Sequence, residues 1–169
     1  MGSSERDDAF SAYVVARRTQ LHRTAYLLCG DRHRAEDLVQ TTLTKLYLAW
    51  PRLRDDGNVD AFARRVLVNA HIDETRRPWR RERSGLDGHD LPTEPGDRLE
   101  DGDLLERALA GLPAGQRRVV VLRHYWGLSV EETAADLGCS TGNVKSQTSH
   151  ALRRLEQALS PHVDRREAR

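Results

Sequence analysis

Residues 129–155 read SVEETAADLGCSTGNVKSQTSHALRRL, and this stretch indicates how the chain folds. Ser129 and Glu132 have the spacing of a capping box, in which each side chain bonds the other residue's backbone N–H at a helix start. Gly138 suits the left-handed conformation that ends a helix. Six residues later, Val144 is placed to pack a second helix onto the first. The stretch therefore predicts a helix-turn-helix.

The second helix of this motif, which Ser140 is expected to cap, presents a polar outer face. Recognition helices place hydrogen-bonding and cationic side chains near their N-terminal end, against base edges and phosphates. Asn143 can bond adenine in the major groove, and Lys145 can bond guanine or a phosphate. The alternative is a helical hairpin with an ordinary polar face. The outward residues are Thr141, Asn143, Lys145, Ser146, Ser149, His150 and Arg153.

The rest of the chain also shows helical spacing of its apolar residues. No stretch alternates as a strand does, so we expect an all-α fold. A helix capped by Asp31 is expected to stop at Pro51. A polar turn is predicted over residues 52–58, and Asp60 is expected to cap a third helix. The last helix is expected to stop at Pro161.

The distribution of charge divides the chain into two domains. Residues 1–82 hold fifteen basic and twelve acidic side chains, and residues 104–169 hold ten basic and seven acidic ones. Between them, residues 83–103 hold two basic and seven acidic side chains together with several Gly and Pro residues. We expect two small helical domains and a flexible acidic linker. The predicted boundaries are 5–82 and 104–160 for the domains, 83–103 for the linker and 161–169 for a polar tail.

Composition argues against several classes of protein. The 169 residues contain no apolar run near the roughly 18 residues of a membrane span. The first ten, MGSSERDDAF, lack the apolar stretch of a signal peptide. Cys29 and Cys139 form no CxxC pair, so we expect two small buried thiols in a reducing cytoplasm. Common nucleotide-binding, zinc-protease and serine-hydrolase motifs are missing, so we expect no catalysis, metal or cofactor.

Two further segments carry candidate binding residues. Trp79 is surrounded by arginines, a mixture that suits a phosphate backbone and a stacked base, or a solvated helix end. In the segment DRHRAEDLVQTTL, the acidic and amide side chains face outward while Leu38 leads inward. Physical chemistry alone favours a solvated face here, stabilised by the helix dipole. The residues concerned are Arg76, Arg77, Arg80, Arg81 and Arg83 in the first segment, and Glu36, Asp37 and Gln40 in the second.

Three segments, taken in order, resemble one family. RHRAEDLVQTTLTKLYLAW (32–50) and FARRVLVNAHIDETRR (62–77) precede the acidic segment, and LPAGQRRVVVLRHYWGLSVEETAADLGCSTGNVKSQTSHALRRL (112–155) follows it. Residues 8–160 thereby resemble an extracytoplasmic-function (ECF, group 4) RNA polymerase sigma factor of the sigma-70 family. They look most similar to its actinobacterial SigE-like subgroup. The AEDLVQ and NVKSQ segments are the most specific part of this resemblance.

The resemblance implies two helical domains, sigma regions two and four, in a subunit that gives core RNA polymerase its promoter specificity. Region two would bind the clamp helices of the β′ subunit and capture unstacked bases of the single-stranded −10 non-template strand. Phe62 stands where many relatives carry Trp. The positions matching the clamp-binding segment are Glu36, Asp37, Leu38 and Gln40. Those matching the −10 segment are Asp55, Asn58, Phe62, Arg64, Arg65, Asn69, Arg76, Arg77 and Arg80.

Region four would bind the double-stranded −35 element and grip the polymerase β flap with its apolar surface. Gln147 stands where many relatives carry Arg. The sequence leaves open whether an anti-sigma factor is a further partner. A stand-alone helix-turn-helix regulator is the alternative function, and the AEDLVQ face distinguishes the two because a regulator needs no clamp-binding helix. The implied −35 residues are Ser140, Thr141, Asn143, Lys145, Ser146, Ser149 and Arg153.

Overall fold

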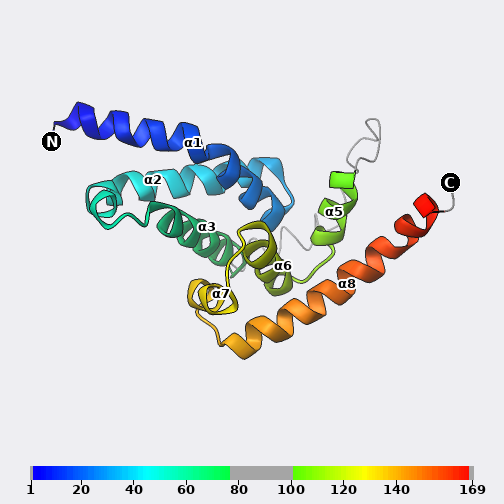
Figure 1. Cartoon of the computed structure of the whole chain (residues 1–169). Helices are drawn as coiled ribbons and strands as arrows, with labels where there is room; N and C mark the ends of the chain where they lie inside the picture. Colours follow the sequence, from blue (N-terminus) through cyan, green and yellow to red (C-terminus); the bar gives the residue numbers. More distant parts are fainter. Residues whose placement is uncertain (1, 77–100, 168–169) are drawn as a thin grey trace. The chain divides into compact units, whose positions relative to one another are not determined.

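The computed structural model describes residues 2–76 and 101–167, and over these ranges the regular elements are helices (Figure 1). The all-α prediction is confirmed. The chain forms two compact units, one up to Arg76 and one beyond it. The predicted linker at 83–103 lies outside the described residues except for 101–103. Arg77 and Arg80 lie entirely outside them. Domain boundaries at 5–82 and 104–160 therefore stay a prediction.

The first unit packs three helices against one another (Figure 1): α1 (Ser3–Cys29), α2 (Arg32–Asp56) and α3 (Val59–Arg76). Gly30 adopts the left-handed conformation, with φ at 70°, which ends α1 and lets the chain reverse. Asp31 caps α2 as predicted, because its side chain accepts a bond from the Arg34 N–H at 2.9 Å. The fully buried core includes Leu28, Val39, Leu46, Leu67 and Val68.

Two boundaries in this unit were predicted wrongly. Pro51 lies inside α2, which continues to Asp56, so the predicted polar turn over 52–58 shrinks to Gly57 and Asn58. A proline inside a helix costs about 3 kcal/mol. Trp50 is buried beside it, and this packing offsets the cost because helices in proteins are stabilised mainly by their apolar face. Asp60 is likewise not a cap, because it lies in the first turn of α3.

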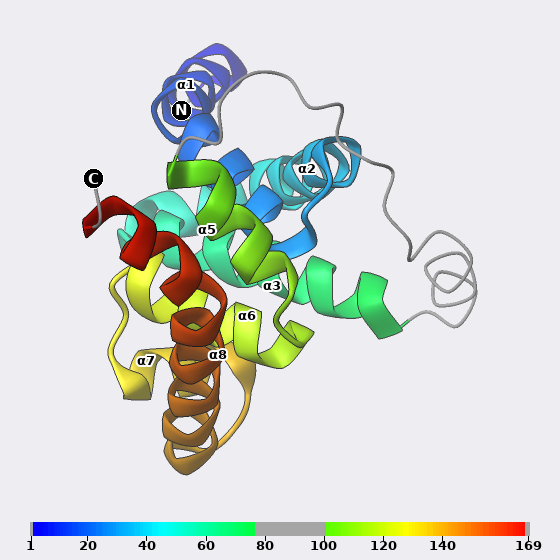
Figure 2. The same cartoon turned by 90° about the vertical axis from the view of Figure 1, so that its right-hand side faces the viewer.

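The second unit gathers α5 (Asp101–Ala110), α6 (Ala114–Val120) and α7 (Val130–Leu137) along α8 (Thr141–Glu167), as Figure 2 shows. A π-helical segment, Val121–Tyr125, extends α6 and was not predicted. The core of the helix-turn-helix consists of Val119, Ala134 and Val144, with Val130, Leu137 and Cys139 packed against it.

The end of α8 was also predicted wrongly. Pro161 lies inside the helix, which continues to Glu167. Proline removes one backbone bond, but its fixed φ is close to the helical value, so a helix can continue beyond it. Residues 161–167, which were predicted to form a polar tail beyond the last helix, therefore have a helical backbone.

Candidate functional site

The helix-turn-helix is held by the local bonds that its sequence predicts. Ser129 Oγ accepts the Glu132 N–H at 3.0 Å, and the Glu132 carboxylate accepts the Ser129 N–H at 2.7 Å, so the capping box is complete. Gly138, with φ at 64°, makes the left-handed turn. Ser140 Oγ then accepts the Asn143 N–H at 3.1 Å and caps α8. These bonds fix where the second helix of the motif begins.

The start of α8 separates an inner face from an outer one. Val144 is 0% exposed and anchors the helix in the core. Gln147 is half-buried, and the hydroxyl of Thr148 donates to the Val144 carbonyl at 2.7 Å. The predicted −35 residues all lie on the exposed part of this helix and its cap: Ser140, Thr141, Asn143, Lys145, Ser146, Ser149 and Arg153.

The first unit places most of the predicted −10 residues at its surface. Asp55 and Asn58 are exposed around the short connection between α2 and α3, and Phe62 is half-buried one turn into α3. Asn69, Arg65 and Arg76 are exposed further along the same helix. Arg64 differs, because it is only 9% exposed, and its contact with the DNA backbone stays a prediction. Arg77 and Arg80 lie outside the described residues.

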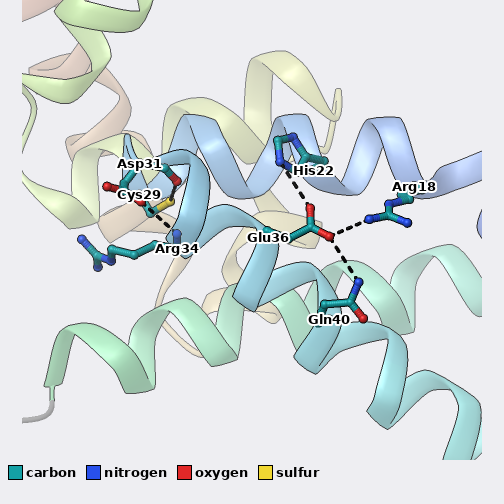
Figure 3. A network of polar contacts seen from close by, with 7 residues as sticks. All are labelled: Arg18, His22, Cys29, Asp31, Arg34, Glu36 and Gln40. Atoms are coloured by element: carbon teal, nitrogen blue, oxygen red, sulfur yellow. Dashed lines mark hydrogen bonds and ion pairs between the residues drawn. The ribbon is translucent and has the colours of Figure 1, made fainter. Parts of the chain in front are cut away.

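The first turns of α2 carry an ordered polar network around Glu36 (Figure 3). The Arg18 guanidinium lies 2.6 Å from Glu36 Oε1, and the Gln40 amide donates to the same oxygen at 3.2 Å. His22 Nε2 lies 3.7 Å from the other carboxylate oxygen. The Gln40 bond and the Arg18 charge hold the pKa of the Glu36 carboxyl below its usual value, so this group is ionised at neutral pH.

The network adds Arg18 and His22 to the predicted clamp-binding segment, and Leu38 points inward as its helical spacing predicts. Asp37 and Gln40 are exposed, but Leu38 is 5% exposed and packs into the core, so it supports the face without belonging to it. Arg18 and His22 were not predicted, because they come from α1. Their contact with Glu36 depends on how α1 and α2 pack, which spacing along one helix does not indicate.

A second link missed by sequence analysis joins the start of α2 to the end of α3. The Arg34 guanidinium lies 3.5 Å from Glu74 Oε2, and the Glu74 side chain is 9% exposed. His71, one turn earlier, is also buried. Because α2 carries the Glu36 face and α3 carries predicted −10 residues, this ion pair connects the two surfaces within one unit.

The cysteines and other potential ligands form no site over residues 2–76 and 101–167. Cys29 and Cys139 are free, and both are half-buried where buried thiols were predicted. Burial raises the pKa of the Cys29 thiol, which donates to the Asp31 carbonyl at 3.2 Å. Within the described ranges, no three His, Cys, Asp or Glu side chains are grouped to hold a metal, and no helix is both long and apolar enough to span a membrane.

One unit carries a helix-turn-helix with a polar outer face, and the other is a three-helix unit with exposed polar residues of its own, a combination that is typical of a two-unit DNA-binding protein. Residues 13–81 match Sigma-70 region 2, and residues 102–155 match Sigma-70, region 4. The RNA polymerase sigma-E factor of Streptomyces coelicolor is 41% identical over 156 residues, which cover 89% of this chain and 85% of that protein. The chain belongs to the extracytoplasmic-function family of RNA polymerase sigma factors.

Other relatives agree with this assignment. The ECF RNA polymerase sigma factor SigM of Mycobacterium tuberculosis is 30% identical over 171 residues, covering 94% of this chain and 87% of that one. The sigma factor RpoE of Bartonella quintana, solved with the anti-sigma factor NepR, superposes with a TM-score of 0.69 at 30% identity, covering 90% of this chain and 97% of that one. The family favours a sigma factor over a stand-alone regulator.

Proposed function

We propose that this chain is a dissociable initiation subunit that binds core RNA polymerase, recognises the −10 and −35 promoter elements and directs transcription initiation. It would act in the cytoplasm and contribute no catalysis of its own. The observation that carries this proposal is the pairing, in one chain, of the exposed face around Glu36, Asp37 and Gln40 with a helix-turn-helix. A stand-alone DNA-binding regulator would need only the helix-turn-helix.

The polymerase contact is best supported at the start of α2. Arg18 and Gln40 hold the Glu36 carboxylate in one orientation, so little side-chain freedom is left to lose when a partner binds. Asp37 and Gln40 are exposed beside it. We propose that this face binds the clamp helices of the β′ subunit. The apolar surface of the second unit would contact the β flap.

The promoter contacts divide between the two units. In α8, the exposed side chains of Asn143 and Lys145 would read the double-stranded −35 element in the major groove. In the first unit, the Asn58 turn and Phe62 would capture unstacked bases of the −10 non-template strand. Contacts of this kind offset the few kcal/mol that unstacking a base costs. Asn69 lies on the helix that would capture these bases, and Arg65 and Arg76 would hold the neighbouring backbone.

An anti-sigma factor is a further proposed partner. Two solved relatives carry one: RpoE of Bartonella quintana is bound to NepR, and CnrH is bound to the cytosolic domain of CnrY. CnrH superposes with a TM-score of 0.60 at 25% identity, covering 92% of this chain and 90% of that one. A protein of this type would compete with core polymerase for the same chain.

A titration of the fluorescently labelled chain with sigma-free core RNA polymerase, followed by anisotropy, tests the proposal. We expect tight, saturable binding that Asp37→Ala or Gln40→Ala weakens by about tenfold, because each removes a polar contact of an interface. Glu156→Ala, which removes an exposed acid from α8, is the matched control and should bind as the wild type does. Absence of binding at micromolar core would contradict the proposal.

A further inference from the structure

Tyr13, Arg17 and Asp60 form a polar cluster that joins α1 to the first turn of α3. The Tyr13 hydroxyl donates to Asp60 Oδ1 at 2.8 Å, and the Arg17 guanidinium lies 2.8 Å from Asp60 Oδ2. Both oxygens of one carboxylate are therefore held by α1. Burial and the bond to Asp60 raise the pKa of Tyr13 well above its usual value, so its hydroxyl remains a donor at physiological pH.

The Asp60 carboxylate lies beside the turn that carries the proposed −10 contacts. Gly57, with φ at 67°, and Asn58 are the two residues between α2 and α3. The Asn58 carbonyl accepts the Phe62 N–H at 3.1 Å, which is the first backbone bond of α3. Asp60 stands between Asn58 and Phe62 in the chain. A movement of this helical turn would therefore shift both residues together.

Tyr13 is itself fixed by an aromatic cluster between α1 and α2. Its ring centroid lies 5.5 Å from that of Trp50, and Phe10 meets Trp50 edge-on at 5.3 Å. Trp50 is buried, so the cluster is part of the core. The bond from Tyr13 to Asp60 thus extends this rigid packing to α3.

The ion pair with Arg17 has a different effect. Its two side chains are 45% and 42% exposed, so it contributes little stability by itself. However, Asp60 and Asp55 place negative charge near the turn that would meet a phosphate backbone. Arg17 compensates the charge of Asp60 and reduces its repulsion of DNA.

We propose that Tyr13 and Asp60 are positioning residues for promoter opening, which hold the Asn58 turn and Phe62 in the orientation that captures −10 bases. This inference rests on the proposed function. Neither residue needs to touch DNA for this role. The Tyr13 hydroxyl acts through Asp60, and Asp60 acts through the first turn of α3.

Open-complex formation by the full chain with core polymerase tests the inference. The template is a promoter that the wild-type holoenzyme selects from duplexes with randomised −10 and −35 elements, and opening is followed by permanganate reactivity of unpaired thymines. Tyr47→Phe is the matched control. Like Tyr13→Phe, it removes one phenol hydroxyl, but this hydroxyl lies between α1 and α2, where its partners are Arg6 and Asp7 on α1.

We expect Tyr13→Phe and Asp60→Asn to slow opening about threefold to tenfold, the effect of losing part of one hydrogen bond to a charged group. Both should also reduce the preference for the selected −10 sequence over single-base variants, which a purely stabilising role would not change. The double variant should lose no more than its more severe parent, because the two residues share one bond. Core affinity should stay at the wild-type level throughout.

The opening rate and the −10 base preference are compared per core-bound molecule. If they are the same for Tyr13→Phe and Tyr47→Phe, the positioning role is wrong, and the proposed function still stands. If the wild-type holoenzyme enriches no promoter from the pool, the proposed function fails and this inference fails with it. The two results are distinguishable because the first requires a working wild-type holoenzyme.

Discussion

Asn143 and Lys145 stand on either side of buried Val144, at the start of α8, and are exposed. Their chemistry suits different parts of DNA. An amide has a donor and an acceptor in fixed geometry and can pair with the edge of adenine, whereas an ammonium group is a point charge that any phosphate attracts. Neighbouring residues in one turn of helix are therefore expected to contribute specificity and affinity separately.

Substitution of each residue in the holoenzyme should separate these contributions. We expect Asn143→Ala to relax base preference at one −35 position by about 1–3 kcal/mol, because one bidentate contact is lost. Lys145→Ala should weaken binding to all sequences alike and lower the slope of log affinity against log salt by about one. Fluorescence anisotropy on a set of −35 variants at several salt concentrations measures both. An equal loss on every sequence for Asn143→Ala would instead make it a backbone contact.

At the scale of helices, local signals predicted starts better than ends. Asp31, Ser129 and Ser140 cap as expected because a capping bond involves residues only three apart. Pro51 and Pro161 were predicted to end helices that continue past them. A proline's local cost can be offset by packing elsewhere in the fold, which the sequence around it does not show.

The same distinction holds for the candidate site. The outward face of α8 could be predicted from helical spacing, and the exposure of its residues follows from the burial of Val144. The partners of Glu36 and Asp60 could not be predicted, because both come from another helix. Arg18 lies 18 positions from Glu36 in the chain, and Tyr13 lies 47 positions from Asp60. The burial of Arg64 could not be predicted either, since it depends on the neighbouring helices.

The capping box of α7 allows a test of an element by itself. Ser129→Ala should destabilise the start of α7 by about 0.5–2 kcal/mol, because the Glu132 N–H loses its acceptor and the reciprocal geometry is lost. Amide hydrogen exchange in α7 should accelerate accordingly, and exchange in α1 should stay unchanged. Ser146→Ala is the control, because it also removes a serine hydroxyl but from an exposed position within α8. Equal exchange rates in Ser129→Ala and the control would contradict the capping role.

At the scale of the whole molecule, charge is nearly balanced. The chain carries 27 Lys and Arg residues against 26 Asp and Glu residues, for a net charge of +1. Non-specific affinity for DNA comes from neutralised phosphates and their released counterions, so a nearly neutral chain gains little of it. A sigma factor can tolerate this weakness, because core polymerase would supply the remaining contacts with the promoter.

We therefore expect the free chain to bind a labelled promoter duplex weakly at physiological salt, with a Kd no tighter than about 1 μM, in the range of non-specific binding. Addition of equimolar core polymerase should tighten binding by at least about a hundredfold, toward the nanomolar affinities of specific complexes. Anisotropy with the chain alone, core alone and both together measures this difference, and core alone controls for contacts that polymerase makes by itself. Nanomolar, sequence-selective binding by the free chain would identify a regulator that acts without polymerase, because its own two units would then suffice to recognise the promoter.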